Sequence, residues 1–141
     1  MTLSPMEEFT QRLLEQPVVA ILRGITPTEI EAVAAALIDQ NFRIIEVPLN
    51  SPNALESIRL LADAFGEQAL VGAGTVLNKD DVHAVRDAGG RMIVSPNTNV
   101  DVIRTSVELG LLSLPGFATP SEAFTAVDAG AHGLKLFPAD G

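Results

Sequence analysis

Three charged residues lie inside segments of the sequence that otherwise have the composition of buried strands. Arg23 ends the apolar run Val18–Leu22, Glu46 follows two isoleucines, and Lys135 lies between two leucines. An apolar setting favours the neutral form of a lysine amine, which can condense with a ketone to give an iminium that accepts electrons. A neighbouring carboxylate can then transfer protons, and a guanidinium with a hydroxyl, here that of Thr75, can hold a substrate carboxylate.

The four side chains converge if their strands present the same face inward. Side chains in a strand alternate between two faces, so each residue shares its face with residues two positions away. The faces pair Lys135 with Gly133 and Phe137, Glu46 with Ile44 and Pro48, Arg23 with Val19 and Ile21, and Thr75 with Val71 and Ala73. Groups from the C-terminal halves of several strands are typical of barrel active sites.

The residues alone leave a structural interpretation open. In it, Lys135 extends to solvent from a strand end, Glu46 and Arg23 form a buried ion pair, and Thr75 fills a strand. An unpaired buried charge is costly, so some pairing is expected under either interpretation.

The elements that must position these residues alternate between strand and helix. Short runs rich in Val, Ile and Leu predict six strands, at Val18–Leu22, Arg43–Leu49, Leu70–Val76, Met92–Ser95, Leu112–Pro115 and Gly133–Phe137. Helical spacing of apolar residues predicts helices over about 5–16, 27–40, 52–65, 79–88, 100–109 and 120–129. This rhythm indicates an α/β fold with a parallel sheet, either doubly wound or closed into a (β/α) barrel.

Three predicted helices begin with the same sequence pattern. Ser4, Thr26 and Thr119 are each followed by proline and, three positions on, by glutamate, which is the pattern of a capping box.

Composition narrows the classes of function. The 141 residues predict a single domain, and a formal charge of −9 disfavours binding to nucleic acid or to an anionic membrane. There is no cysteine, and the two histidines, His83 and His132, have no spacing typical of metal ligands. The N-terminus lacks the pattern of a signal peptide, so a soluble cytoplasmic protein is expected.

Five motifs in order resemble one family of enzymes. They are Val18–Ile25, Ile45–Pro52, Val71–Leu77, Ile93–Asn97 and Leu134–Ala139, and they are similar to successive motifs of the 2-keto-3-deoxy-6-phosphogluconate and 2-keto-3-deoxy-6-phosphogalactonate aldolases. The resemblance implies a (β/α)8 TIM barrel, usually a homotrimer, that cleaves a phosphorylated keto-deoxy sugar acid to pyruvate and D-glyceraldehyde 3-phosphate without a metal or other cofactor.

The resemblance also implies a role for each matching residue. Lys135 would form the Schiff base and Glu46 would be the acid and base. Arg23 and Thr75 would help to hold the pyruvate carboxylate, while Pro96 and Phe137 would line the pocket.

Two departures from the family pattern bear on substrate and completeness. Gluconate-type enzymes have an arginine where this chain has Asn50, whereas Arg23 is kept, so the chain is more similar to the galactonate branch. Family members have about 200 residues, so a chain of 141 is expected to supply the N-terminal helix and the first six strands of an incomplete, C-terminally truncated barrel.

Three functions therefore stand as expectations. The first is a class I aldolase acting on 2-dehydro-3-deoxy-6-phosphogalactonate, with the phosphogluconate epimer as the alternative substrate. The second is a truncated, non-catalytic subunit that binds a small anion through Arg23. The third is a different phosphosugar enzyme with a barrel fold, such as an isomerase.

Overall fold

The computed structural model describes residues 2–140 and contains a curved parallel sheet. Its five strands lie in sequence order: β1 (Ala20–Ile21), β2 (Ile44–Pro48), β3 (Leu70–Gly74), β4 (Met92–Val94) and β5 (Leu112–Leu114). Each strand pairs in parallel with the next. A doubly wound sheet would reverse its strand order part-way, so this arrangement is that of a barrel.

The fifth predicted strand, Leu112–Pro115, is observed as β5, and a second short strand that was not predicted follows it directly. β5 pairs with β4, and after Pro115 the chain continues as β6 (Gly116–Phe117), which pairs in parallel with β7 (Lys135–Leu136). The Pro115 carbonyl accepts a hydrogen bond from the Lys135 N–H at 2.9 Å. The chain thus changes its pairing partner from β4 to β7 at Pro115, which has no backbone N–H.

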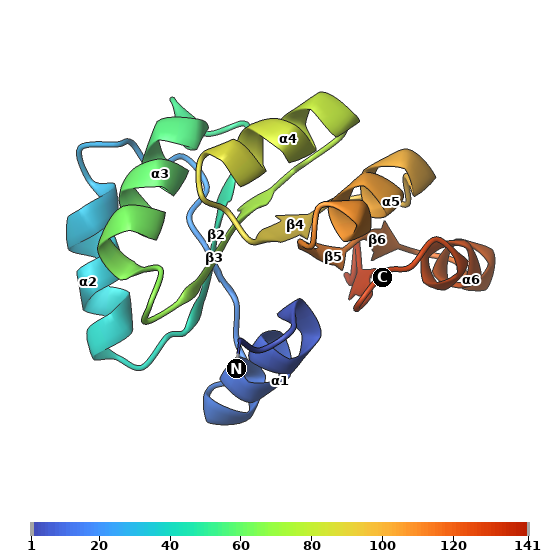
Figure 1. The fold of residues 1–141 in the computed structure, drawn as a ribbon, viewed down its shortest axis with the longest axis horizontal. Helices are drawn as coiled ribbons and strands as arrows, with labels where there is room; N and C mark the ends of the chain where they lie inside the picture. Colours follow the sequence, from blue (N-terminus) through green and yellow to red (C-terminus); the bar gives the residue numbers. More distant parts are fainter. Residues whose placement is uncertain (1, 141) are drawn as a thin grey trace.

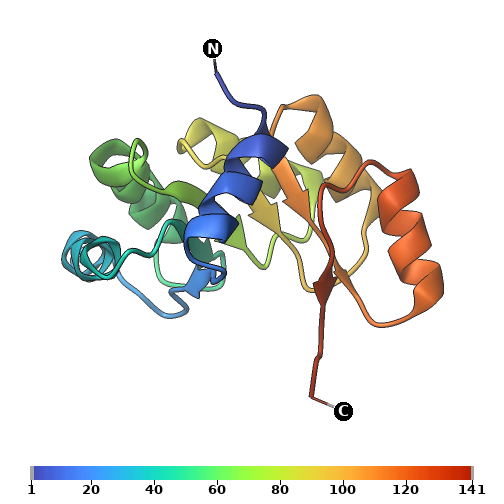
Figure 2. The ribbon, with the colours of Figure 1, turned by 90° about the horizontal axis from the view of Figure 1, so that it is seen from below.

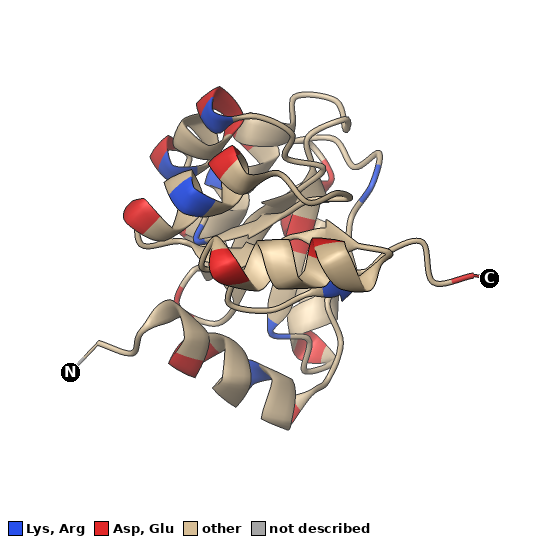
Figure 3. Cartoon of the chain, turned by 90° about the vertical axis from the view of Figure 1, so that its right-hand side faces the viewer, with Lys and Arg blue, Asp and Glu red and all other residues tan. Residues whose placement is uncertain are grey.

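Helices flank the sheet on both sides. On its outer face lie α2 (Ile30–Asp39), α3 (Ala54–Phe65), α4 (Lys79–Asp87) and α5 (Val100–Glu108), and α6 (Pro120–Asp128) follows β6. Helix α1 (Pro5–Glu15) lies against the inner side, as Figures 1 and 2 show. The acidic residues are spread over the helices (Figure 3).

The two faces of the sheet pack into two separate apolar cores. The outer core packs Ile45 and Val47 of β2 against the helices. The inner core contains Ile44 of β2 and receives Phe9 and Leu13 from α1. Glu46, between Ile45 and Val47, therefore belongs to the inner face, as the period of two predicts.

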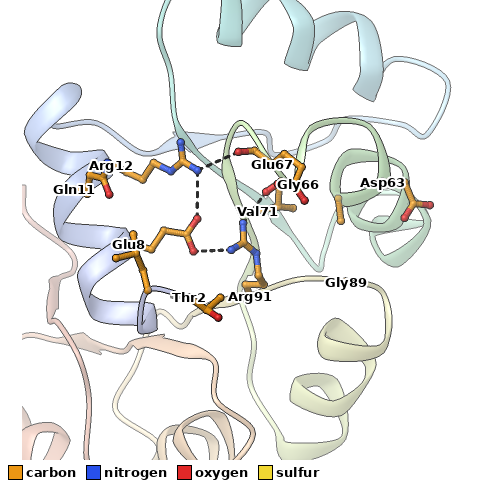
Figure 4. A pocket seen from close by; sticks show the side chains of 12 residues that line it. Thr2, Glu8, Gln11, Arg12, Asp63, Gly66, Glu67, Val71, Gly89 and Arg91 are labelled. Atoms are coloured by element: carbon orange, nitrogen blue, oxygen red, sulfur yellow. Dashed lines mark hydrogen bonds and ion pairs between the residues drawn. The ribbon is translucent and has the colours of Figure 1, made fainter.

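Salt bridges hold α1 against the inner side of the sheet. Glu8 pairs with Arg12 of its own helix and with Arg91, which precedes β4 (Figure 4). Arg91 also donates to the Gly66 carbonyl at 2.8 Å. These groups line a hollow of about 680 Å³ at the N-terminal ends of the strands. Its arginines are occupied in holding α1 in place.

The predicted α/β fold is confirmed, and most predicted helix starts are correct. Ser4 and Thr119 form capping boxes with Glu7 and Glu122. The box predicted at Thr26 is wrong, since α2 begins only at Ile30. The Thr26 hydroxyl donates to the Glu29 carboxylate at 2.6 Å instead of accepting a backbone N–H. Residues 27–29, just before α2, form a turn.

The described strands do not close into a ring. Within residues 2–140, β1 pairs only with β2 and β7 only with β6. The chain thus forms the N-terminal helix and the first six strands of a (β/α)8 barrel, with the short strand β6 in addition. Across residues 2–140, the structure has no helix with the length and apolar character needed to cross a membrane.

Candidate active site

A cavity of about 400 Å³ lies between the inner face of the sheet and α1. Its lining is mainly apolar and combines residues from α1 with residues from several strands: Phe9, Leu13, Val19, Ile21, Glu46, Val94, Leu114, Gly133, Leu134 and Lys135. Glu46 and Lys135 are the only ionisable groups among these lining residues. The structure therefore brings together the two residues to which the sequence assigned the chemistry.

Glu46 lies at the centre of β2 and is 2% exposed. Burial raises the pKa of its carboxyl group, and the nearby cations of Lys135 and Arg23 offset part of that rise. A carboxyl group in such a setting holds its proton at higher pH than an exposed one, which suits a group that must both give and take a proton.

Lys135 begins β7 and is half-buried at the cavity wall. Its ammonium lies 5.0 Å from the centroid of the Phe137 ring, two residues along the same strand face. Among residues 2–140, no salt bridge within 4.0 Å joins Glu46 to Lys135 or to Arg23. The interpretation of Glu46 and Arg23 as a buried ion pair is therefore wrong.

Arg23 lies just beyond β1, where it is exposed at the C-terminal edge of the sheet. Its Nη1 donates to Asn50 Oδ1 at 2.6 Å. The next residue, Gly24, donates its N–H to Ser51 Oγ at 3.0 Å. Two adjacent hydrogen bonds therefore join the loop after β1 to the loop after β2 and fix the position of the guanidinium.

Thr75 does not share an inward face with its neighbours as predicted. Val71 and Ala73 pack in the outer core against the helices. The inner positions of β3 are taken by Gly72 and Gly74, and a Cβ at Gly74 would overlap the Glu46 carboxyl group. Thr75 itself follows the strand with φ +56° and is half-buried, so the alternation ends before it.

Pro96 and Phe137 are not among the residues that line the cavity. Pro96 is half-buried beyond β4, with its backbone against Gly116, and Phe137 is 46% exposed beside Lys135. Their expected roles in lining a substrate pocket remain predictions.

Sequence reasoning missed the part played by α1. Phe9 and Leu13 form one wall of the cavity. Their spacing of four residues places them on one face of the helix, and this was the signal available in the sequence. The spacing does not show which surface of the sheet that face covers.

Neither His83 nor His132 is among the residues that line this cavity. His132 Nδ1 accepts the Ser113 N–H at 3.1 Å, and burial lowers the pKa of the imidazole. Within residues 2–140, no three His, Cys, Asp or Glu side chains are grouped so that they could hold a metal ion.

The family model for KDPG and KHG aldolase matches residues 9–141. The chain belongs to this aldolase family. It is 51% identical over 122 residues to the 2-dehydro-3-deoxy-6-phosphogalactonate aldolase of Escherichia coli strain K12, covering 86% of this chain and 60% of that protein. The chain thus spans about three fifths of that relative's length.

Solved structures of aldolases have the same fold. A structure described as native KDPGal superposes with a TM-score of 0.88 at 49% identity, covering 89% of this chain and 61% of the other. The KDPG aldolase of Legionella pneumophila, with pyruvate captured as a covalent carbinolamine, superposes with a TM-score of 0.85 at 28% identity. That match covers 97% of this chain and 64% of the other.

Proposed function

We propose that this protein is a class I aldolase that cleaves 2-dehydro-3-deoxy-6-phosphogalactonate to pyruvate and D-glyceraldehyde 3-phosphate. The observation that carries the proposal is the pair formed by Lys135 and Glu46, which come from different strands and line one apolar cavity. An amine and a carboxyl group that share an apolar cavity can together form and cleave a Schiff base.

The reaction follows from these two groups. The Lys135 amine adds to the C2 ketone, and the resulting carbinolamine loses water to give an iminium. Glu46 removes the proton of the C4 hydroxyl as the C3–C4 bond breaks, so that the aldehyde leaves and the bonding electrons form an enamine. The Glu46 carboxyl returns its proton to C3, and water then hydrolyses the iminium, releasing pyruvate and the free amine.

The remaining sequence-predicted residues bind substrate in this proposal. Arg23 and Thr75 hold the carboxylate of the pyruvate portion, and Pro96 and Phe137 shape the entrance. The Arg23 guanidinium is already held by Asn50 at 2.6 Å, which supports a role in binding a planar anion. The galactonate epimer is favoured by the 51% identity to a phosphogalactonate aldolase.

Assembly and location belong to the same proposal. A homotrimer is expected from the resemblance to the family. A cytoplasmic location suits a phosphorylated sugar acid, since its charges oppose passage through a membrane. Its partners are then the phosphorylated keto-deoxy sugar acid and pyruvate, and the chemistry uses only side chains of the protein.

A coupled assay tests the proposal. Pyruvate release from the two C4 epimers is followed with lactate dehydrogenase and NADH, with Lys135→Ala as the blank. We expect turnover of the phosphogalactonate substrate, with loss of about 100-fold or more in Glu46→Gln because a general acid and base has been removed. Saturable binding of substrate without pyruvate release would indicate a non-catalytic anion-binding protein instead.

A further inference from the structure

We infer that Gly74 is a positioning residue for Glu46, because its missing side chain leaves the space in which the Glu46 carboxyl group lies. The inference rests on the proposed function and adds to it the feature that places the acid–base group. Gly74 itself touches no reacting atom.

The atoms nearest to a side chain added at Gly74 belong to Glu46. A Cβ added there would overlap Glu46 Oε2 and would lie 2.6 Å from Cδ and 3.1 Å from Oε1. These three carboxyl atoms are the nearest neighbours of the added Cβ. In the register of the sheet, Glu46 is opposite Gly72 and Pro48 is opposite Gly74, so the Glu46 side chain leans along β3 toward its C-terminal end.

Backbone conformation gives no other reason for glycine at this position. Gly74 is not among the glycines with positive φ, so alanine can adopt its backbone angles. Gly72 provides a contrast, because a Cβ there would collide with the Met92 carbonyl oxygen and lie 2.6 Å from Met92 Cβ. Alanine at position 72 would therefore separate β3 from β4, whereas the nearest atoms that alanine at position 74 would displace are those of the Glu46 carboxyl group.

The displaced carboxyl group has one direction open to it. Ile45, Val47 and Ala73 are buried in the outer core, and the inner side of Glu46 borders the cavity that Lys135 also lines. The side chain should therefore shift into the cavity that Lys135 also lines, which changes the distances from its carboxyl oxygens to C3 and C4 of a substrate held there. An error of about 1 Å in such a group can lower a rate by roughly 100-fold.

The direct test is the titration of Glu46 in the whole protein. The protein is prepared with ¹³C in the glutamate carboxyl groups, and the Glu46 signal is identified by its absence in Glu46→Gln. We expect Glu46 to titrate at lower pH in Gly74→Ala than in the unmodified protein, with little change in the thermal midpoint. An unchanged Glu46 titration in a folded Gly74→Ala protein would overturn the inference, whether or not the protein is an aldolase.

A second measurement links the position of Glu46 to the reaction. Exchange of the pyruvate methyl protons with D₂O reports enamine formation without the phosphorylated substrate. We expect Gly74→Ala to slow exchange by about 10- to 100-fold while borohydride still attaches pyruvate to Lys135. Loss of the lysine adduct from the unmodified protein would count against the proposed function, and the titration would still decide the role of Gly74.

A double-mutant cycle separates positioning from general damage. Glu46→Asp shortens the side chain by one methylene and removes the overlap with alanine at position 74. The two changes together should therefore slow exchange by less than the product of their separate effects. Independent, multiplicative effects would contradict the inference.

Discussion

Glu46 is held in surroundings that favour its neutral form. It is 2% exposed, and burial outweighs the two nearby cations in setting its pKa above the ordinary value of 4.5. The folded protein therefore binds this proton more tightly than the unfolded chain does. The stabilisation is fully present below pH 4.5 and is lost as the pH rises through the raised pKa of Glu46.

Replacing Glu46 should accordingly stabilise the protein in neutral and alkaline solution. We expect Glu46→Gln to raise the thermal midpoint at pH 8 by roughly 2–5 °C and to change it much less at pH 4. Calorimetry at the two pH values measures the difference, and Glu67→Gln, an exposed glutamate outside the strands, is the matched control. A lower midpoint at pH 8 in Glu46→Gln would show that the carboxylate stabilises the fold.

Residue types identified the chemistry better than they identified which way each side chain faces. Glu46 and Lys135 were recognised because a charge in an apolar strand is unusual, and both line the cavity. Thr75 was expected on an inward face of β3 together with Val71 and Ala73, but that face is the outer one. Both faces of a parallel strand are buried, so composition cannot distinguish them, and the inner face is the one with glycines at 72 and 74.

At the scale of elements, His132 joins the turn before β7 to β5. Its Nδ1 accepts the Ser113 backbone N–H at 3.1 Å, and the backbone N–H of His132 donates to the Ser113 carbonyl at 3.0 Å. Burial lowers the pKa of the imidazole below 6.5. The stabilisation from His132 is therefore present above pH 6.5 and is lost as the pH falls through the lowered pKa.

Variants of His132 should reveal this connection. His132→Ala leaves the buried Ser113 N–H without a partner and should cost about 1–2 kcal/mol of unfolding free energy at pH 7.5. His132→Asn supplies an oxygen acceptor and should lose less while removing the decline at acid pH. Urea denaturation at several pH values checks both, with the exposed His83→Asn as control. Equal stability of His132→Ala and the unmodified protein would show that the hydrogen bond from Ser113 to His132 does not stabilise the fold.

Two of the three helix starts predicted from a capping box are correct, and the one predicted at Thr26 is wrong. Ser4 and Thr119 satisfy both halves of a capping box, and their helices begin at the following prolines. The short strand β6 after Pro115 was not predictable, because it depends on pairing with β7, about twenty residues later in the chain.

At the scale of the whole molecule, two strand edges and several apolar side chains face solvent. β1 and β7 each have one partner within residues 2–140, and Leu136 of β7 is 55% exposed. Unpaired edges with apolar side chains favour association between chains. The order of the strands followed from the sequence rhythm, whereas the openness of the barrel followed from its resemblance to a longer family.

We therefore expect the 141-residue chain to self-associate at micromolar concentration. Sedimentation velocity at several concentrations measures this, and Leu136→Lys should shift the distribution toward monomer because a charge then lies on the open edge. Leu14→Lys, at an 83% exposed position on α1, is the control and should leave it unchanged. A monodisperse monomer at all concentrations would refute the expectation.

In the proposed reaction, the Lys135 amine forms a covalent bond with a keto acid inside this cavity. Incubation with pyruvate and sodium borohydride, followed by peptide mass spectrometry, tests it most directly. We expect one reduced pyruvate adduct per chain at Lys135, none in Lys135→Ala, and a retained adduct in Glu46→Gln. A folded protein that gives no adduct, or an adduct on another lysine, would contradict it.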